Sequence, residues 1–283
     1  KLFYKILSIL KSLLKIRPMQ MGYFYSTKME DYIVKNFKNF DVVFCQSVRA
    51  AQYVQTLKFK KKILDMGDLY SKNYYQTFSY TSFLNPIKYI YFFESILMKR
   101  YERLCFKNFN QILLFSSSEI SSQRIFKNKI VKINFGIDMI SNQFKYKKAN
   151  NRILFIGNLT YLPNKLACSF FINNVMPKIT KIDPKIEFHI VGEISNYDKF
   201  IWQRKKYVTV HGKVKNLSPI IVKSFCALAN LEIASGIQTK ILTYMSYGLP
   251  FVATQKVANS FDEINKRFIP VYKNNNELIN QIF

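Results

Sequence analysis

The 283-residue sequence has few of the residues that build metal sites or disulfide frameworks. It holds four cysteines, which are far apart and form no CxxC pair: Cys45, Cys105, Cys168 and Cys226. This spacing favours neither a zinc site nor a disulfide scaffold, and it suits a protein of the reducing cytoplasm.

Histidines and long apolar runs are also scarce. The two histidines, His189 and His211, stand inside apolar runs of strand type. We therefore expect core or strand-end histidines rather than metal ligands. The most apolar candidate for a spanning helix, residues 87–98, is shorter than the ~18 residues that a bilayer requires. It also carries Lys88 and Glu94, so no transmembrane helix is expected.

Acidic residues are outnumbered, since 43 lysines and arginines face 17 aspartates and glutamates and give a formal net charge of +26. Such an excess of positive charge favours polyanionic binding partners: nucleic acid, an anionic membrane face or phosphorylated substrates. However, the lysines are spread along the chain without a basic arm, and a biased nucleotide composition could also produce the excess. With apolar residues at 49%, the chain can build cores for two ordinary domains.

The stretch ASGIQTKILTYMSYGLPFVAT, residues 234–254, organises the rest of the sequence. It predicts a small-residue loop, a short helix that ends at Gly248 before Pro250, and a buried strand. Lys240 falls in the first turn of this helix, where the macrodipole is positive. A bound anion would remove that conflict, so the stretch is a candidate diphosphate cradle. Equally, loop–helix–strand units are common in α/β domains, and Lys240 would then be a solvated surface charge.

Alternating apolar runs predict strands and helices in succession, which indicates two parallel sheets with helices on both faces. Residues 141–151 break the pattern and mark the expected domain boundary. In the first half, strands are expected at 41–45, 62–66, 111–115 and 130–133, and helices at 27–37, 47–57, 84–108 and 118–126. In the second half, strands are expected at 152–156, 186–191, 208–211, 226–229 and from 251, and helices at 166–179 and 219–224.

The first 16 residues predict an amphipathic helix with an apolar face and lysines away from it. A basic amphipathic helix can lie on a membrane surface. We favour the commoner alternative, a helix that packs on its own sheet. In the second half, Gly157, Gly192 and Gly212 each follow a predicted strand, which hints at a backbone-lined ligand cleft, although glycine is also a common turn residue.

Four motifs after residue 151 carry a resemblance to a known family: FIGNLTYLPN (155–164), HIVGE (189–193), VTVHGKV (208–214) and SGIQTKILTYMSYGLPFVAT (235–254). They resemble the C-terminal half of glycosyltransferase family 4, whose members have the GT-B fold and transfer a sugar from a nucleotide-sugar donor. A weaker match continues upstream through DVVFCQSVRAAQY, KILDMGDLYS, the pair Tyr101 and Glu102, and FGID.

The resemblance implies a donor site in the C-terminal domain. Lys240 would be the catalytic residue, which neutralises the leaving diphosphate by electrostatic stabilisation without a protein nucleophile. The implied donor-binding residues are Gly157, Asn158, Gly212, Lys213, Val214, Ser235, Gly236, Ile237, Gln238, Thr239 and Thr243. The resemblance further implies a retaining reaction without a bound metal, with a UDP- or GDP-linked sugar as substrate and no other cofactor.

The sequence departs from the family pattern at several positions. Thr243 stands where the family usually has a glutamate that holds the donor ribose, so ribose binding should be weaker. Asn230 and Ala234 replace a proline and a glycine that are more often found there. The chain also lacks an opening strand with a glycine-rich loop, begins inside a helix and stops at Phe283. We therefore expect a fragment that is truncated at both ends.

Together these observations predict an α/β protein of GT-B type, with two Rossmann-like, doubly wound parallel-sheet domains that face a cleft. Residues 1–145 would form the acceptor-side domain, incomplete at its N-terminus, and residues 151–283 the nucleotide-sugar-binding domain. The expected function is a hexosyltransferase-type glycosyltransferase that builds a cell-surface polysaccharide or glycolipid precursor on a lipid-linked or saccharide acceptor.

The expected location is the cytoplasm, with contact to an anionic inner membrane as an option, and no nucleic-acid partner. Three alternatives stay open, of which the third, a nucleic-acid-binding module, is supported by the charge alone. One is a catalytically degenerate protein that binds nucleotide sugars or polyanions. Another is a GT-B nucleotide-sugar epimerase, which would need more acidic and histidine groups than this chain offers.

Overall fold

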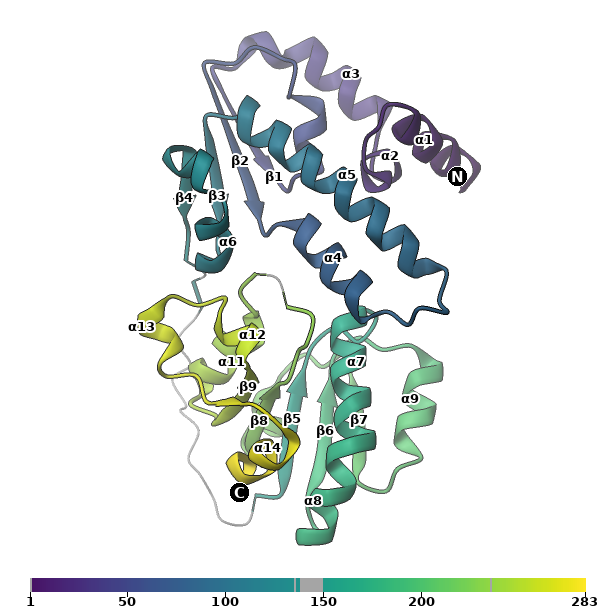
Figure 1. Cartoon of the computed structure of the whole chain (residues 1–283), viewed down its shortest axis with the longest axis vertical. Helices are drawn as coiled ribbons and strands as arrows, with labels where there is room; N and C mark the ends of the chain where they lie inside the picture. The colour runs from purple at the N-terminus through teal and green to yellow at the C-terminus, as the bar shows by residue number, and fades with distance from the viewer. Residues whose placement is uncertain (1, 135, 138–149, 235) are drawn as a thin grey trace. The chain divides into compact units, whose positions relative to one another are not determined.

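The computed structural model of the chain describes residues 2–134, 136–137, 150–234 and 236–283. The chain folds into two compact units, Lys1–Phe135 and Gly136–Phe283, here called the N-terminal and the C-terminal unit. Each unit contains a parallel sheet with α-helices packed against it (Figure 1). Most of the expected boundary segment, residues 141–149, lies outside the described residues, as do Phe135 and Asp138 of the FGID motif.

In the described part of the N-terminal unit, four strands form a parallel sheet in the order β1-β2-β3-β4. They are β1 (Val42–Gln46), β2 (Lys61–Gly67), β3 (Gln111–Leu114) and β4 (Ile130–Lys132). Because this order follows the chain, right-handed connections place the connecting helices on one face of the sheet. Burial agrees: Cys45 and Leu64 are buried on one face, whereas Val42 and Phe44 on the other face are 51% and 57% exposed.

The longest of the described helices in this unit, α5 (Ile87–Asn108), lies in front of the sheet in Figure 1. The bounds of all described helices in this unit follow. They are α1 (Leu2–Leu14), α2 (Met19–Tyr23), α3 (Thr27–Asn36), α4 (Tyr70–Tyr80), α5 (Ile87–Asn108) and α6 (Ser117–Ser122), with 3₁₀ turns at Phe37–Asn39, Ala50–Tyr53 and Arg124–Lys129. The expected helix at 47–57 is wrong. Its buried residues, Val48, Ala51 and Val54, are spaced by three, which suits the three residues per turn of a 3₁₀ segment.

Buried glutamates hold helix N-termini in the N-terminal unit. The carboxylate of Glu94 accepts hydrogen bonds from the backbone N–H groups of Met19 (2.8 Å) and Gln20 (3.1 Å) at the start of α2. Glu102 and Glu119 do the same at the start of α4, where they accept from backbone N–H groups in the segment 69–71. Negative charge is stabilised at these ends because they carry unpaired N–H groups and the positive pole of the helix dipole.

Helix α1 does not pack as expected. Its polar side faces the protein: Ser12 is buried and donates a hydrogen bond to the carbonyl of Pro18 (2.8 Å). Gly22 of α2 lies so close to α1 that an added Cβ would stand 2.4 Å from the carbonyl oxygen of Ser8. The apolar side is exposed, with Leu10 at 52% and Leu14 at 84%. The preference for a helix that buries its apolar face on its own sheet was therefore wrong.

The C-terminal unit has a doubly wound sheet, as predicted. Its strands, within the described residues, are β5 (Arg152–Ile156), β6 (Glu187–Val191), β7 (Val208–Gly212), β8 (Ser224–Ala229), β9 (Phe251–Thr254) and β10 (Val271–Tyr272). All pairs are parallel, in the order β10-β9-β8-β5-β6-β7. The chain runs from β5 to one edge and then returns through β8 to the other edge. The topological switch point therefore lies between β5 and β8, where ligands of such sheets bind.

The three helices predicted in the C-terminal unit are present with shifted bounds, and the structure adds helices that were not predicted. The described helices of this unit are α7 (Leu162–Phe170), α8 (Met176–Ile182), α9 (Asn196–Gln203), α10 (Ser218–Ile221), α11 (Thr239–Tyr247), α12 (Gln255–Ala258), α13 (Glu263–Lys266) and α14 (Asn275–Ile282). A π-helical turn at Phe171–Val175 joins α7 and α8, which were expected as one helix. Pro177 explains the turn, because it lacks an N–H and its ring clashes with the carbonyl four residues earlier.

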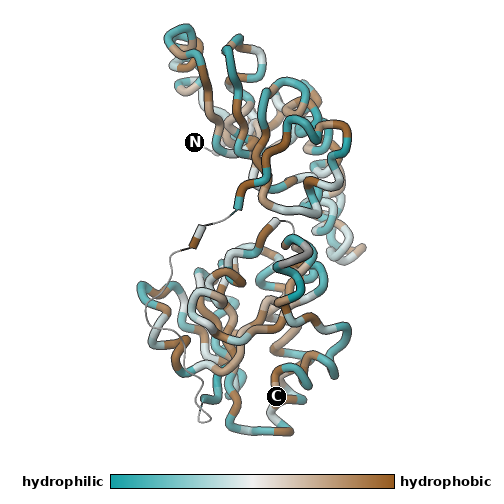
Figure 2. Tube along the Cα trace, turned by 90° about the vertical axis from the view of Figure 1, so that its left-hand side faces the viewer, coloured by the Kyte–Doolittle hydropathy of each residue, from teal (hydrophilic) through white to brown (hydrophobic). Residues whose placement is uncertain are grey.

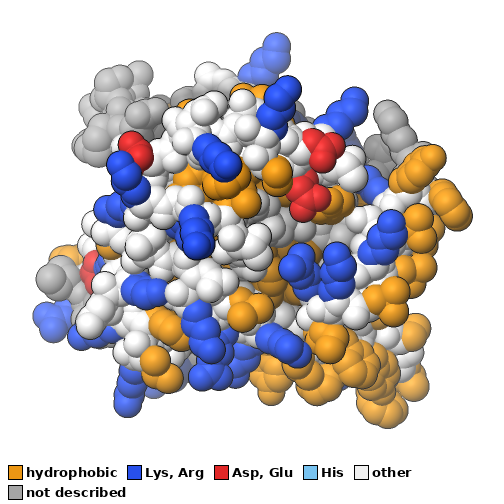
Figure 3. Space-filling view, turned by 90° about the horizontal axis from the view of Figure 1, so that it is seen from above, with side chains coloured by type: hydrophobic (Ala, Val, Ile, Leu, Met, Phe, Trp, Pro, Cys, Tyr) orange, Lys and Arg blue, Asp and Glu red, His pale blue; other side chains and the backbone are white. Residues whose placement is uncertain are grey.

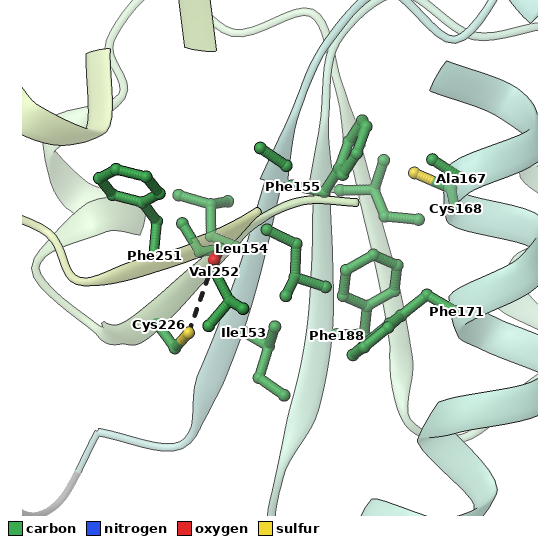
Figure 4. Close-up of a cluster of buried hydrophobic side chains, with 14 of the residues drawn as sticks. Ile153, Leu154, Phe155, Ala167, Cys168, Phe171, Phe188, Cys226, Phe251 and Val252 are labelled. Carbon is green, nitrogen blue, oxygen red and sulfur yellow. Dashed lines mark hydrogen bonds between the residues drawn. The ribbon is translucent and has the colours of Figure 1, made fainter. Parts of the chain in front are cut away.

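The core of the C-terminal unit is built from the strands and the helices that cover them. Figure 4 shows Ile153, Leu154 and Phe155 of β5 at its centre, and all three are fully buried. The rings of Phe171 and Phe188 lie 4.7 Å apart between centroids and join the π turn to β6. Figure 2 shows hydrophobic stretches of the trace inside both units and hydrophilic ones in their outer loops. None of the helices in the described residues has the length and hydropathy needed to cross a membrane.

Candidate functional site

The candidate site of the C-terminal unit lies at the switch point, where α11 is fixed by one tyrosine. The hydroxyl of Tyr244 accepts a hydrogen bond from the backbone N–H of Ile156 (3.0 Å) and donates one to the carbonyl of Leu228 (3.1 Å). These backbone groups belong to the ends of β5 and β8, where the two strands diverge. Tyr244 is fully buried, so it satisfies both groups and positions α11 over the switch point.

The end of α11 follows the sequence prediction. Gly248 has φ +68° in the left-handed region, and the N–H of Leu249 bonds the carbonyl of Tyr244 (2.9 Å). Glycine adopts this conformation without a steric penalty, and Pro250 cannot continue the helix. The register of α11 is thereby set, so that Lys240 falls in the first turn.

Lys240 is a buried cation, not the solvated surface charge of the alternative interpretation. Its side chain is almost fully buried, and its Nζ donates to the Oδ1 of Asn164 (2.7 Å). The ammonium also lies 3.8 Å from the ring centroid of Phe155. Burial lowers the pKa of Lys240 to about 7, because charge is disfavoured where water is excluded. Among the described residues, the salt bridges of the C-terminal unit involve other cations.

Asn164 connects Lys240 to the turn after β5. Its Nδ2 donates to the carbonyl of Asn158 (2.8 Å), and its amide lies against Gly157, where an added Cβ would stand 3.0 Å away. The side chain of Asn158 is occupied locally by Thr160, which donates from its N–H and hydroxyl. Asn164 was not selected from the sequence, although it closes the FIGNLTYLPN motif. Its polarity in the buried first turn of α7 is the signal that could have identified it.

The three glycines that follow strands meet through their backbones. The N–H of Gly157 bonds the carbonyl of Val191 (2.9 Å), and the N–H of Gly192 bonds the carbonyl of Gly212 (2.9 Å). Gly192 has φ +143°, and an added Cβ would stand 1.8 Å from the carbonyl oxygen of Gly157. Only glycine fits there, so this position serves close backbone approach. The row of glycines is thus real and lies along the carboxyl ends of β5, β6 and β7.

The structure separates the predicted residues into two groups. Gly212 ends β7, and Lys213 and Val214 follow it, across β6 from Gly157. Lys213 is exposed, whereas Val214 packs partly against the core. The group around Lys240 lies at the switch point itself. Consequently Gly212, Lys213 and Val214 could border only a part of a ligand that reaches beyond β6.

The described residues that directly precede α11 are buried or half-buried. Gly236 is buried with φ +69°, Ile237 packs partly against the core, and Gln238 precedes the helix without capping it through its side chain. Thr239 is exposed at the first helical position. Ser235, also predicted to bind the donor, lies outside the described residues.

Thr243 lies one turn into α11 and uses its hydroxyl locally. Its Oγ1 donates to the carbonyl of Thr239 (3.2 Å), the residue one turn earlier. This bond is common for threonine in a helix and does not prevent the hydroxyl from also accepting a hydrogen bond. Thr243 thus offers a weaker polar contact than a carboxylate would.

The two histidines lie side by side on neighbouring strands. His189 is a buried residue of β6, and His211 lies near the end of β7, as expected for core and strand-end histidines. The Nδ1 of His189 lies 2.8 Å from the Nε2 of His211, and its Nε2 lies 2.8 Å from the carboxylate of Glu187. Burial lowers the pKa of both histidines. His211 directly precedes Gly212 in β7, so the pair lies beside the second group of predicted residues. In the described parts of the chain, no group of three His, Cys, Asp or Glu side chains could hold a metal ion.

The C-terminal unit thus combines a doubly wound parallel sheet, a buried lysine at its switch point and glycines at the carboxyl ends of β5, β6 and β7. In agreement, residues 150–282 match the family model described as "Glycosyl transferases group 1". A curated relative, described as an uncharacterized 44.6 kDa protein in the cps region of Klebsiella pneumoniae, is 26% identical over 197 residues. That match covers 68% of this chain and 48% of the relative.

Solved structures of GT-B glycosyltransferases share the fold over most of the chain. TarM matches with a TM-score of 0.62 and 14% identity, over 89% of this chain and 49% of TarM. HepE from Anabaena, in complex with UDP, matches with a TM-score of 0.64 and 12% identity, over 94% of this chain and 73% of HepE. The chain thus has the GT-B type of α/β fold, with two parallel sheets, and spans about half the length of the Klebsiella relative and of TarM.

Proposed function

We propose that the chain is part of a glycosyltransferase that binds a nucleotide sugar in its C-terminal unit and moves the sugar to an acceptor hydroxyl. The bond between C1 of the sugar and the diphosphate breaks, and its electron pair stays on the diphosphate oxygen. The acceptor oxygen forms the new bond to C1 and its proton leaves with the diphosphate. In this reaction, which retains the configuration at C1 and uses no metal, stabilisation of the leaving group supplies the catalysis.

The observation that carries the proposal is the incomplete pairing of Lys240. An ammonium group has three N–H donors, and a buried one needs partners for them. The described residues provide the amide oxygen of Asn164 and the face of Phe155, neither of which carries a negative charge. A diphosphate at the start of α11 would supply the missing charge and would also satisfy the backbone N–H groups at that helix end.

The surroundings fit a nucleoside diphosphate sugar. Gly236, with φ +69°, gives the loop before α11 its backbone conformation, and Gly157 leaves room for the amide of Asn164 that contacts Lys240. Asn158 follows Gly157 after β5, and Thr239 directly precedes Lys240. A base would lie toward Gly212, Lys213 and Val214, and a ribose toward Thr243. In complexes whose titles name ligands, HepE binds UDP and the pneumococcal transferase GtfA binds UDP and GlcNAc. We propose UDP or GDP as the nucleotide for this chain.

The acceptor that we propose is a lipid-linked or saccharide precursor of a cell-surface polysaccharide. The relative in the cps region of Klebsiella supports this class, and the excess of basic residues suits a diphosphate-linked acceptor at an anionic inner-membrane surface. This setting is cytoplasmic and involves no nucleic acid.

A binding experiment tests the proposal without requiring turnover. Isothermal titration calorimetry should show UDP or GDP binding to the chain, and Lys240→Met should weaken it at least about 30-fold, the effect of losing one partner of a buried charge pair. Lys178→Met, which removes an exposed lysine of α8, is the matched control and should leave binding unchanged. Absence of binding to both nucleotides, or equal effects of the two substitutions, would overturn the proposal.

A second candidate is a nucleotide-sugar binder without transferase activity. The hydrogen bond of Thr243 to its own helix favours it, because this hydroxyl then contributes less to holding the ribose. Mass spectrometry of UDP- or GDP-linked sugars, incubated with the chain and a saccharide acceptor, separates the two. A transferase releases the nucleoside diphosphate, whereas a binder leaves the donor intact.

A further inference from the structure

Arg49 of the N-terminal unit lies just beyond the carboxyl end of β1. Ser47, between the strand and Arg49, has φ +76°, a left-handed conformation that is uncommon for a residue other than glycine. The N–H of Ser47 bonds the carbonyl of Asp65 in β2 (2.8 Å), and the N–H of Ala50 bonds the carbonyl of Ser47 (3.0 Å). The chain therefore turns sharply after β1 and places Arg49 at the edge where open α/β sheets bind ligands.

Two aromatic rings and a buried amide hold the guanidinium of Arg49 in place. Its Cζ lies 4.2 Å from the ring centroid of Phe24 and 5.1 Å from the ring centroid of Tyr70. Its Nε donates to the Oε1 of Gln20 (2.8 Å). Such contacts preorganise the planar guanidinium, so that less conformational entropy is lost when it binds a ligand. Arg49 thus offers a fixed fork of donors rather than a mobile surface charge.

Most of the donors of this guanidinium are unused. A guanidinium has five N–H groups, and the one on Nε is bound by Gln20. Among the described residues, the ion pairs involve cations other than Arg49, and no acceptor is bound by the four N–H groups on its Nη atoms. Both Nη atoms are reached by solvent. An anionic ligand can therefore reach the fork from outside.

Gln20 adds an unpaired donor to the same group of side chains. It is 6% exposed, and its Oε1 must be the atom that faces Arg49, because a guanidinium only donates. Its Nε2 is therefore the other end of the amide, and this atom is buried without a hydrogen-bond partner. A buried donor that lacks an acceptor destabilises the fold. An oxyanion bound at Arg49 would bring acceptor oxygens to this place.

A pocket of about 340 Å³ adjoins the fork. Gln20 and Phe24, which hold Arg49, also line this pocket, together with Ile9, Tyr74 and Tyr91 among others. Its volume lies within the range of sites for small molecules, and its lining is largely aromatic and aliphatic, as is common for such sites. The pocket can therefore take the organic part of a ligand whose anionic group lies at the guanidinium.

The charges around the pocket favour an anion. Residues 1–29 contain no aspartate or glutamate, and the Nζ of Lys5 lies 3.9 Å from the ring centroid of Tyr23, another lining residue. Glu94 also lines the pocket, but its carboxylate is bound by backbone N–H groups at the start of α2. Figure 3 shows a face of the molecule on which Lys and Arg side chains are common and Asp and Glu side chains are few. The field of the protein therefore attracts anions, and Arg49 fixes where one binds.

We propose that Arg49 binds the phosphate group of a phosphate ester, whose organic part lies in the pocket beside Gln20 and Phe24. The fork donates two parallel N–H···O bonds to the phosphate, the geometry in which a guanidinium recognises oxyanions. This site shares no residue with the nucleotide site proposed around Lys240. Its role as the place of a phosphate-bearing acceptor rests on the proposed function, whereas the binding itself does not.

A carboxylate is the competing occupant of the fork, because it also accepts two parallel hydrogen bonds from a guanidinium. Such a group could belong to a small acid or to an acidic side chain elsewhere in a longer protein. The number of donors favours phosphate: a carboxylate has two oxygens for the N–H groups of Arg49 and the unpaired amide of Gln20, whereas a phosphate ester has three. The test therefore compares the two anionic groups on similar alkyl chains.

Nuclear magnetic resonance of the Arg49 side chain tests the proposal on the chain as it is. The Nε–Hε cross-peak, identified by its absence in Arg49→Lys, should shift in titrations with octyl phosphate and with glucose 1-phosphate. Octanoate, which carries a carboxylate on a similar alkyl chain, should bind at least about fivefold more weakly than octyl phosphate. An ester that binds more tightly than inorganic phosphate supports the role of the pocket, and the tighter of the two esters identifies the organic part as an alkyl chain or a sugar.

Calorimetry with octyl phosphate measures the effect of substitutions. Arg49→Lys keeps the charge but loses the planar fork, so the affinity should fall at least about tenfold. Arg100→Lys, at an exposed arginine of α5, is the matched control and should bind like the parent. Phe24→Leu keeps Arg49 and removes one of its rings, so it should weaken binding by a smaller factor, roughly threefold. Circular dichroism confirms that the variants fold.

An unshifted Nε–Hε cross-peak would overturn the proposal, as would octanoate that binds as tightly as octyl phosphate, or equal effects of Arg49→Lys and Arg100→Lys. If neither ester binds more tightly than inorganic phosphate, the pocket has no part in the site. The proposed function fails separately. Loss of UDP binding with an intact response of Arg49 to the esters would contradict only the nucleotide site at Lys240. A loss of UDP binding in Arg49→Lys would instead assign Arg49 to the nucleotide and refute a separate site.

Discussion

The two units bury ionisable groups in opposite ways. In the N-terminal unit, the carboxylates of Glu94, Glu102 and Glu119 are buried on helix N-termini, where backbone N–H groups compensate them. In the C-terminal unit, Lys240 is buried at a helix N-terminus, where the dipole opposes its charge. One oxygen of Glu119 is also buried without a partner, but each of the three glutamates has backbone N–H donors, whereas Lys240 has no anionic partner among the described residues. This difference supports the proposal of an anion site in the C-terminal unit.

The two sheets also differ in strand order. In the C-terminal unit the strand order reverses and creates a switch point with a buried core around it. In the described part of the N-terminal unit the order follows the chain, and Val42 and Phe44 of β1 remain exposed on one face. Parallel sheets are normally covered on both faces. The N-terminal unit thus has exposed apolar residues on one face of its sheet, whereas the C-terminal unit has a switch point at the centre of its sheet.

The largest expected effect comes from a pair of buried tyrosines, one in each unit. Tyr244→Phe should destabilise the C-terminal unit by about 2–4 kcal/mol, because it leaves the N–H of Ile156 and the carbonyl of Leu228 buried without a partner. Tyr101→Phe should leave the stability of the N-terminal unit unchanged or raise it, since the hydroxyl of Tyr101 is buried without a hydrogen-bond partner.

Urea denaturation measures both variants. Fluorescence of Trp202 reports the C-terminal unit, and hydrogen exchange of the β2 and β3 amides reports the N-terminal unit. Equal destabilisation by the two substitutions would break the comparison, because it would mean that Tyr244 contributes only packing.

A smaller effect is an opposite response of the two units to pH. Burial raises the pKa of Glu102 to about 7, and burial together with Asp68 does the same for Glu119. A carboxyl group with a raised pKa in the folded state loses its contribution as pH rises from about 4.5 through 7. The N-terminal unit should therefore lose stability, on the order of 1–2 kcal/mol, between pH 5 and pH 8.

In the C-terminal unit the sign reverses. The folded pKa of Lys240 is about 7, below its ordinary value of 10.5, so the unfolded chain binds more protons between these values and stability rises with pH. Hydrogen exchange of β5 and β8 amides, corrected for the intrinsic pH dependence, should show rising protection from pH 6.5 to 8.5. Lys240→Met should remove this rise. A parallel response of both units would contradict the account.

The smallest effect concerns the ribose contact. Thr243→Glu should tighten UDP binding by roughly fivefold, because a carboxylate accepts stronger hydrogen bonds from the ribose hydroxyls than a threonine does. Thr243→Ser is the control, since it keeps a hydroxyl, and calorimetry compares them. An unchanged or weaker affinity in Thr243→Glu would mean that the ribose lies away from this turn of α11.

Much of the C-terminal unit could be predicted from the sequence, because its signals are local. Gly248 and Pro250 end α11 through their own backbone preferences, and this end fixes Lys240 in the first turn. The burial of Lys240 and its contact with Asn164 could not be predicted, since 76 residues separate the partners along the chain. Such a pairing depends on how β5 and β8 lie together in the sheet.

The N-terminal unit was predicted less well, for reasons that are equally physical. The period of α1 correctly gave a helix but not the direction of its apolar arc, because periodicity contains no information on what a face contacts. The composition of residues 47–57 suits an α-helix and a 3₁₀ turn equally well. The spacing of Val48, Ala51 and Val54 favours the 3₁₀ turn only once these residues are known to be buried.

The most direct test of the central claim is the pKa of Lys240, measured with and without nucleotide. With ¹³C-labelled lysine, the Cε chemical shift of Lys240 can be identified by its absence in Lys240→Met and followed as a function of pH. The account predicts that the pKa of Lys240 is about 7 in the free chain. Saturating UDP or GDP should raise this pKa by roughly two units or more, because the diphosphate stabilises the ammonium. An unchanged pKa with the nucleotide bound would show that Lys240 does not meet the diphosphate, and would contradict the account.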